Sequence, residues 1–251
     1  MRSFWAWCVA CAAMCTGGQA HEFWIEPVEG TPAVQQPLDV QVFVGEDFDG
    51  EVFPFEPRAY REAYWIGPSA VNVLHTRSLA DGMPSLLFQA EGLHILAVAS
   101  YPTALVHETV DDFVAFAEEV GGSDMIAENP PTSDKNGGLR ETYRRFSKML
   151  THLGGSKGQD RRLGFEYEWV KSWSGITLYA GDKVASHHPV DLHCRYRNSQ
   201  VTQERLLTDD MGRVAYRSTL PERCLINAVF LTPPAPGRDW SSDWVSMTWD
   251  P

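Results

Sequence analysis

Short segments rich in apolar and β-branched residues, separated by glycine, proline and aspartate, recur along most of this chain. Such segments are typical of β-strands, and many of them at short intervals indicate a sandwich of strands. The predicted strands of the first half are 38–44, 63–66, 85–88 and 94–99. Those of the second half are 165–170, 176–179, 190–197, 204–208, 213–217, 224–231 and 244–249. The pattern therefore predicts a mainly β chain.

The hydrophobic periodicity changes between about residues 108 and 155. Residues 110–120 place apolar side chains at helical spacing and are followed by two glycines, which predicts a helix. The segment 129–138 is rich in proline, asparagine and glycine and predicts a linker. Residues 140–153 predict a second helix that ends at Gly154. The solvent-exposed face of that helix would carry three basic side chains, Arg144, Arg145 and Lys148.

These segments divide the chain into two predicted domains. Residues 21–163 would form an N-terminal β-sandwich with the short helical insertion at about 108–155, and residues 164–251 an immunoglobulin-like β-sandwich. Within the second domain, Asp209–Gly212 is typical of a hairpin turn in which Gly212 can adopt a positive φ. The expected fold is thus two Ig-like β-sandwich domains with a short helical insertion between them.

The first twenty residues have the composition of a secretory signal peptide. They carry one basic residue, Arg2, then an apolar run from Phe4 to Cys15, then small residues up to Ala20. The apolar run is shorter than the roughly 20 residues that a spanning helix needs. We predict cleavage after Ala20 and a periplasmic mature chain that does not insert into the membrane. A membrane anchor, or a lipoprotein modified on a cysteine of this segment, is the alternative.

Charge and cysteine content narrow the function further. The chain has 21 Lys and Arg against 33 Asp and Glu, a formal net charge of −12, which argues against a nucleic-acid partner. Without the signal segment, two cysteines remain, Cys194 and Cys224. An isolated pair in an oxidising compartment predicts one disulfide, and a pair of ligands for a soft metal is the competing interpretation.

Cleavage after Ala20 would make His21 the first residue, with a free α-amine beside its imidazole. The amine nitrogen and the ring Nδ1 can chelate one metal ion. An imidazole from another strand would complete a site suited to Cu²⁺ or, with further ligands, to Ni²⁺ or Co²⁺. We predict His94 as that second ligand, because a strand would hold it on a rigid element. The alternative is that His21 is only the residue that follows the cleavage site.

The other histidines have structural interpretations that we favour. Their positions are loop edges, turns, a predicted helix end and, for His193, the flank of a cysteine. These residues are His75, His107, His152, His187, His188 and His193. The chain contains no G-x-S-x-G, no H-E-x-x-H and no glycine-rich nucleotide loop, so we predict no enzymatic activity. Tryptophans such as Trp24, Trp65, Trp169 and Trp173 could in principle stack on a sugar, but core packing is the favoured interpretation.

Five short motifs, in this order along the chain, resemble those of the DUF4198 family of exported bacterial proteins. They are 20–27 with 44–50, 92–95 with Ser100, 143–148, 208–213 and 239–244. The resemblance implies a periplasmic component associated with nickel or cobalt uptake beside a membrane transporter. It also implies an Ig-like or carboxypeptidase-regulatory-like C-terminal sandwich and a metal role for His21 and His94.

The chain departs from this family pattern in two places. The stretch Asn227–Phe230 lacks the histidine that many relatives have after its Ala-Val, and Phe165–Tyr167 replaces the usual Leu-Glu-Leu. A site in this chain would therefore have fewer nitrogen ligands or a different geometry. The leading hypothesis is a periplasmic protein that binds Ni²⁺, Co²⁺ or Cu²⁺. The alternatives are a metal-free periplasmic interaction scaffold and a copper enzyme with an N-terminal histidine site.

Overall fold

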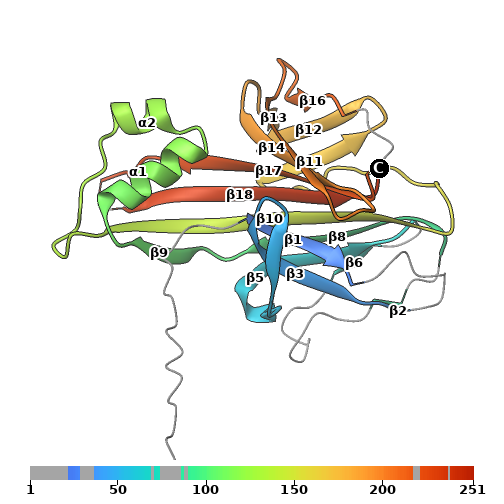
Figure 1. Cartoon of the computed structure of the whole chain (residues 1–251). Coiled ribbons are helices and arrows are strands. Elements are labelled where there is room, and N and C mark those ends of the chain that lie inside the picture. The colour runs from blue at the N-terminus through green and yellow to red at the C-terminus, as the bar shows by residue number, and fades with distance from the viewer. Residues whose placement is uncertain are drawn as a thin grey trace, which may run out of the picture.

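A computed structural model describes residues 22–28, 37–68, 71–73, 86–87, 90–216, 221–236 and 238–251 (Figure 1). The predicted signal peptide, His21 and His75 lie outside these described residues. The elements of the first half are β1 (Glu22–Pro27), β2 (Pro37–Leu38), β3 (Val40–Glu46), β4 (Asp49–Phe53), the 3-10 turn η1 (Pro57–Ala59), β5 (Tyr60–Ile66), β6 (Val71–Val73), β7 (Leu86–Leu87), β8 (Gly92–Ser100) and β9 (Thr103–His107). Those that follow are α1 (Val110–Glu119), α2 (Ser123–Glu128), β10 (Leu139–Leu153), β11 (Tyr167–Ser172), β12 (Gly175–Ala180), β13 (Lys183–Val184), β14 (Pro189–Arg195), β15 (Val201–Leu207), β16 (Arg213–Val214), β17 (Arg223–Thr232) and β18 (Trp240–Trp249).

A nine-stranded sheet forms the centre of the molecule. Its order is β15-β14-β17-β18-β10-β8-β5-β6, and β9 also pairs with β10. At the middle of this sheet β10 runs parallel to β18 and antiparallel to β8. The boundary predicted near residue 163 falls between β10 and β11, and strands from both sides of it lie in this one sheet.

A smaller sheet covers each face of the central one (Figure 1). On one face the sheet β1-β3-β4 packs Phe23, Ile25 and Val42 against residues of β8 and β10. On the other face β11, β12, β13 and β16 pack Trp169 and Leu178 against the same central strands. The prediction of a mainly β fold is therefore confirmed, and both small sheets pack on the same central sheet.

The predicted helix at 110–120 is confirmed as α1. Thr109 caps it with a reciprocal pair of hydrogen bonds. The Asp112 N–H donates to Thr109 Oγ1 over 3.1 Å, and the Thr109 N–H donates to the Asp112 carboxylate over 2.9 Å. Its buried face packs Phe116 on Trp244 of β18, with ring centroids 5.7 Å apart.

As predicted for a linker, residues 129–138 contain neither helix nor strand. No helix of the described part of the chain is long and apolar enough to span a bilayer.

The prediction of a second helix at 140–153 is wrong, because this segment forms the long strand β10. Since small sheets cover both faces of the central sheet, β10 buries side chains on both sides. Phe146 and Leu150 lie in the core on the side of β11, and Met149 and Leu153 lie in the core on the side of β1. Apolar residues on two faces of a strand produce the three- and four-residue spacings that otherwise indicate a helix.

The three basic residues predicted for a solvent-exposed face, Arg144, Arg145 and Lys148, have other surroundings. Lys148 is 2% exposed, and its ammonium contacts two buried carboxylates. Arg144 Nε lies 2.6 Å from a carboxylate oxygen of Asp243 on the adjacent strand. The Arg145 guanidinium lies over the ring of Phe23 at 5.1 Å from its centroid. Each charge is thus paired with a carboxylate or an aromatic ring rather than with water.

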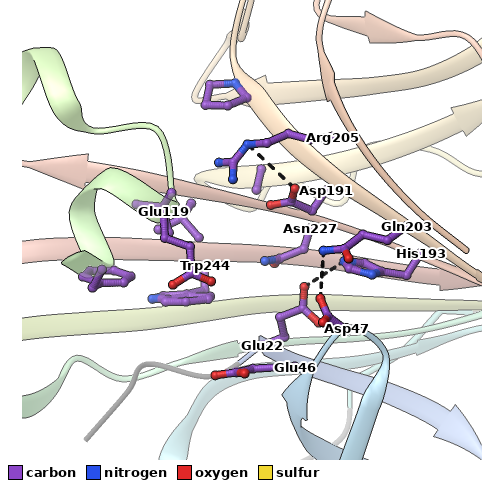
Figure 2. A pocket seen from close by; sticks show the side chains of 15 residues that line it. Glu22, Glu46, Asp47, Glu119, Asp191, His193, Gln203, Arg205, Asn227 and Trp244 are labelled. Carbon is purple, nitrogen blue, oxygen red and sulfur yellow. Dashed lines mark hydrogen bonds and ion pairs between the residues drawn. The ribbon is translucent and has the colours of Figure 1, made fainter. Parts of the chain in front are cut away.

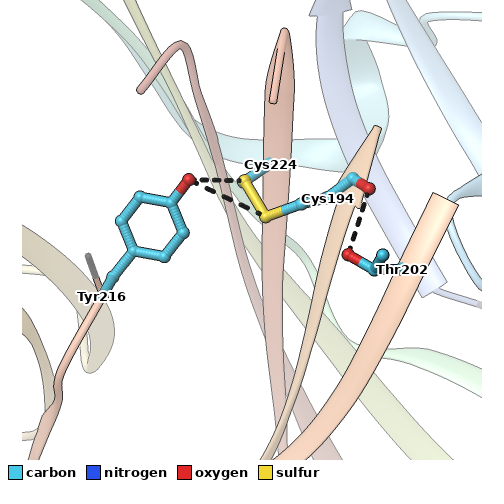
Figure 3. The surroundings of a disulfide bond; sticks show 4 residues. All are labelled: Cys194, Thr202, Tyr216 and Cys224. Atoms are coloured by element: carbon cyan, nitrogen blue, oxygen red, sulfur yellow. Dashed lines mark hydrogen bonds between the residues drawn. A yellow bond between two sulfur atoms is a disulfide. The ribbon is translucent and has the colours of Figure 1, made fainter. Parts of the chain in front are cut away.

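The cysteine prediction is confirmed by the pairing of β14 with β17. Cys194 and Cys224 are register partners in these strands, and their Sγ atoms are 1.95 Å apart (Figure 3). The Tyr216 hydroxyl lies 3.2 Å from Cys224 Sγ. A turn is present at Asp209–Gly212, with Gly212 at φ 67°, but it is not the predicted hairpin, because β15 and β16 do not pair with each other. It leads from β15 in the central sheet to β16 in the four-stranded sheet.

Candidate functional site

A cavity of about 190 Å³ lies where the start of β1, the end of α1 and the central sheet meet (Figure 2). We call it the acidic pocket, because five carboxylates from four different parts of the chain line it. These are Glu22 on β1, Glu46 at the end of β3, Asp47 in the turn after it, Glu119 on α1 and Asp191 on β14. The basic side chains among the lining residues are Arg205 and His193.

His193 is the buried imidazole of this pocket. It is 1% exposed, and its Nε2 lies 3.1 Å from a carboxylate oxygen of Glu22. Burial opposes protonation of the ring, but the interaction with Glu22 and the charges of Asp191 and Asp47 outweigh it and raise the pKa of His193. The carboxylates around this imidazole favour a positive charge at its position, which a metal cation can supply.

Two carboxylates of the pocket, Glu119 and Asp191, have raised pKa values. Burial, followed by the charges of Glu46 and Asp191, raises the pKa of Glu119. Burial also raises the pKa of Asp191, although Arg205 Nε lies 3.9 Å from its carboxylate and acts in the opposite direction. Like charges in a partly buried space repel, so a cation in the pocket would stabilise all of them at once.

Asn227 on β17 adds a neutral oxygen to the same pocket. The residue is 4% exposed, and its Oδ1 is buried with no hydrogen-bond partner among the described residues. The His193 Nδ1 is likewise buried with no hydrogen-bond partner among the described residues. Buried polar atoms are nearly always satisfied in folded proteins, by the chain, by water or by an ion. The pocket therefore contains an oxygen and a nitrogen atom that a bound water molecule or ion can contact (Figure 2).

Side chains of the described residues do not complete a metal site by themselves. Among those residues, no group of three or more His, Cys, Asp or Glu side chains lies close enough together to hold an ion. The predicted ligand His21 lies outside the described residues, but it is bonded directly to Glu22, whose side chain lines the acidic pocket.

The other predicted ligand, His94, has different surroundings. It is 2% exposed on β8, its Nε2 lies 2.8 Å from the Ala90 carbonyl oxygen, and its ring stacks on Trp65 with centroids 5.9 Å apart. Burial lowers the pKa of His94, which keeps the ring neutral near pH 7.

Strand register separates His94 from the start of β1. The carbonyl oxygen of Phe23 accepts a hydrogen bond from Ser246, which is the register partner of Ser147 on β10. His94 is the register partner of Thr151, four residues further along β10, a distance of roughly 13 Å at strand spacing. The structure thus does not bring His94 beside Glu22, and its role as a metal ligand stays a prediction.

From the sequence, the role predicted for His193 is structural, because this residue flanks Cys194. A usable signal was present in the two-residue spacing of Asp191 and His193, which places both side chains on one face of a predicted strand. The partners on that face, Glu22 and Glu119, come from distant segments, so their approach could not be seen in the sequence.

Comparisons with known proteins leave the family open. No family model matches the chain, and no curated protein matches it. One solved structure, described as a tetra-tandem repeat in the extending region of a large adhesion protein, aligns with 92% of this chain at 10% sequence identity and a TM-score of 0.20. This chain spans half of that one. At this TM-score the likeness carries no argument about fold or function.

Proposed function

We propose that this protein binds a transition-metal ion, Ni²⁺, Co²⁺ or Cu²⁺, in the acidic pocket, with His21 as a nitrogen ligand. The observation that carries the proposal is the position of Glu22. This residue follows His21 in the chain, and its carboxylate lies 3.1 Å from the buried His193 imidazole. A processed N-terminus would thus bring an amine and a second imidazole toward an existing imidazole and several carboxylates.

The charge of the pocket supports a cation rather than an anion or a neutral ligand. Five carboxylates line it, against one arginine and one histidine. Burial, with a smaller contribution from neighbouring carboxylates, raises the pKa values of Glu119 and Asp191. A divalent ion would neutralise part of this repulsion.

The donor types support a transition metal over calcium or magnesium. Calcium and magnesium take oxygen ligands, whereas nickel, cobalt and copper prefer sites that include imidazole nitrogen. His193 supplies one such nitrogen, and the Oδ1 of Asn227 is a further oxygen donor. In this proposal His193 takes the place that sequence analysis gave to His94.

The cellular context of the proposal is the periplasm, where the ion would be held for a membrane importer. Two features support this address: the signal-like segment 1–20, and the Cys194–Cys224 pair at disulfide distance, which suits an oxidising compartment. The transporter as partner rests on the resemblance to exported proteins of metal uptake.

Calorimetric titration of Ni²⁺, Co²⁺ and Cu²⁺ tests the proposal. The protein should begin at His21, as confirmed by mass spectrometry, and a chain with an N-terminal extension serves as the control. We expect one-to-one binding that the extension abolishes. His193→Gln should weaken it at least about tenfold, or 1.4 kcal/mol, whereas the matched change His94→Gln should leave it intact.

Three results would contradict this assignment. Equal binding with and without the extension would remove His21 from the site. Loss of affinity in His94→Gln but not in His193→Gln would move the site to β8. If none of the three ions binds, the metal-free scaffold is favoured.

A further inference from the structure

A second cavity of about 360 Å³ lies where the end of β10, the loop after it, the β11–β12 hairpin and the end of β18 meet. We call it the tryptophan cavity, after its residues Trp173 and Trp249. Its volume falls at the lower end of the range for small-molecule sites, roughly 300 to 1,000 Å³. It shares no lining residue with the acidic pocket.

Trp173 stands at the tip of the β11–β12 hairpin and is 94% exposed. Hydrogen bonds of Ser172 stabilise the hairpin without any contribution from the Trp173 side chain. Ser172 Oγ donates to the Gly175 carbonyl over 3.0 Å and accepts from the Ser174 N–H over 3.3 Å. Tight turns favour glycine, asparagine, aspartate, serine and proline, so an indole at this position contributes nothing to the turn. Its ring is instead a large flat surface at the edge of a cavity.

Trp249 also lines this cavity. The residue is 1% exposed, and its Nε1 is buried with no hydrogen-bond partner among the described residues. Its ring is therefore a fixed part of the cavity wall.

The remaining polar side chains of the cavity combine donors and acceptors. Burial and the nearby charge of Lys171 lower the pKa of His152, so its neutral ring offers one donor and one acceptor nitrogen. Lys171 adds a cationic donor and Asp250 an anionic acceptor. The cavity thus has charged side chains of both signs, Lys171 on one side and Asp160 and Asp250 on the other.

The wall that carries these groups is fixed in place. The Leu93 N–H donates to the Lys157 carbonyl over 2.7 Å, which holds the loop against β8. The Lys171 N–H donates to the buried Asp160 carboxylate over 2.7 Å, which holds the same loop against β11. The cavity is therefore pre-formed, which reduces the entropy cost of binding.

We propose that the tryptophan cavity binds a neutral saccharide, with one pyranose ring stacked on Trp173. The apolar C–H face of a pyranose matches an exposed indole, and its hydroxyls both donate and accept hydrogen bonds. Those hydroxyls would engage His152, Lys171 and Asp250. A purely apolar ligand would leave these polar groups unpaired, and a charged one would oppose either Lys171 or Asp250.

Saturation-transfer NMR with a panel of methyl pyranosides and disaccharides tests this proposal on the whole protein. We expect at least one sugar to receive transfer at its ring protons. Trp173→Ala should weaken binding about tenfold, since aromatic stacking and the burial that accompanies it contribute on this scale. Trp173→Phe should retain most of the affinity. Tyr101→Ala removes another exposed aromatic side chain, 47% exposed, and should have no effect.

The proposal fails if no sugar of the panel binds at millimolar concentration, or if Trp173→Ala binds as well as the unchanged protein. Binding of the aromatic dye anilinonaphthalene sulfonate at this cavity, with no sugar competing, would also overturn the proposal in favour of an apolar surface. Because Trp173 is exposed, its replacement does not endanger folding.

Discussion

Two clusters of charged residues on opposite sides of the fold differ in how completely their charges are paired. In the first, which we call the lysine cluster, Lys148 Nζ lies 2.8 Å from Glu168 and 3.2 Å from Asp160, and also donates to two carbonyl oxygens. Glu168 in turn accepts from the backbone N–H of Leu163. In the acidic pocket, by contrast, five carboxylates share one arginine and one histidine.

The difference separates a structural role from a binding role. A buried charge is tolerated when its partners and hydrogen bonds are all supplied by the chain, as in the lysine cluster. An excess of like charges in a partly buried site lowers the stability of the fold. Such an excess is retained where a ligand of the opposite charge is to be bound. Four changes, in order of decreasing effect, test this contrast.

Replacing Lys148 should have the largest effect. Lys148→Met leaves Asp160 and Glu168 buried without their cation, and we expect a loss of about 3–5 kcal/mol in the free energy of unfolding, measured by urea denaturation. Arg140→Met is the control, because its ion pair with Asp239 is exposed and should contribute under about 1 kcal/mol. If both variants lose the same free energy of unfolding, the buried lysine cluster is no more important for stability than an exposed ion pair.

Removing the disulfide should have the next largest effect. Cys194 follows His193 on β14, and Cys224 lies on β17, the strand that carries Asn227 of the acidic pocket. Replacing both cysteines with alanine should cost about 2–4 kcal/mol under oxidising conditions. In a reducing agent the unchanged protein loses its cross-link, so the two proteins should then differ little. A difference of the same size in reducing agent would assign the effect to packing instead.

Acidification should destabilise the edge of the acidic pocket through His188. This residue precedes Pro189 of the pocket, and burial lowers its pKa to about 4, against 6.5 for an unhindered histidine. The unfolded chain therefore binds a proton that the folded chain does not. Stability present above pH 6.5 is lost as the pH falls toward 4, by up to about 3 kcal/mol.

Urea denaturation between pH 7.5 and 4 measures this loss for the unchanged protein and for His188→Gln, whose curve should be flatter. The adjacent His187 has a side chain that is 70% exposed, so His187→Gln should keep the original slope. If His188→Gln shows the full pH dependence, the loss arises elsewhere.

Neutralising one carboxylate of the acidic pocket should have the smallest effect, and of the opposite sign. Burial and the neighbouring charges raise the pKa of Glu119, so its ionised form is disfavoured in the folded state. Because the side chain is partly exposed, Glu119→Gln should stabilise the protein by only a few tenths of a kcal/mol while weakening metal binding. Glu118→Gln, on the same helix but outside the pocket, should do neither. If Glu119→Gln destabilises the protein, repulsion between the carboxylates does not lower the stability of the fold.

Much of the fold could be predicted because its signals are local. Strand segments such as 190–197 and 224–231, helix α1, and the glycine in the turn at Gly212 follow from residue spacing and backbone preference within a few positions. The Cys194–Cys224 pair followed from counting cysteines. These features do not depend on what packs against them, so the sequence alone determined them.

The tertiary structure decided what depends on distant partners. Residues 140–153 form a strand because small sheets from other parts of the chain cover both faces of β10, and Lys148 is buried because Asp160 and Glu168 meet it there. His193 lies in the acidic pocket because Glu22 approaches it from the other end of the sequence. Electrostatic pairing depends on distance in space, which periodicity along the chain does not contain.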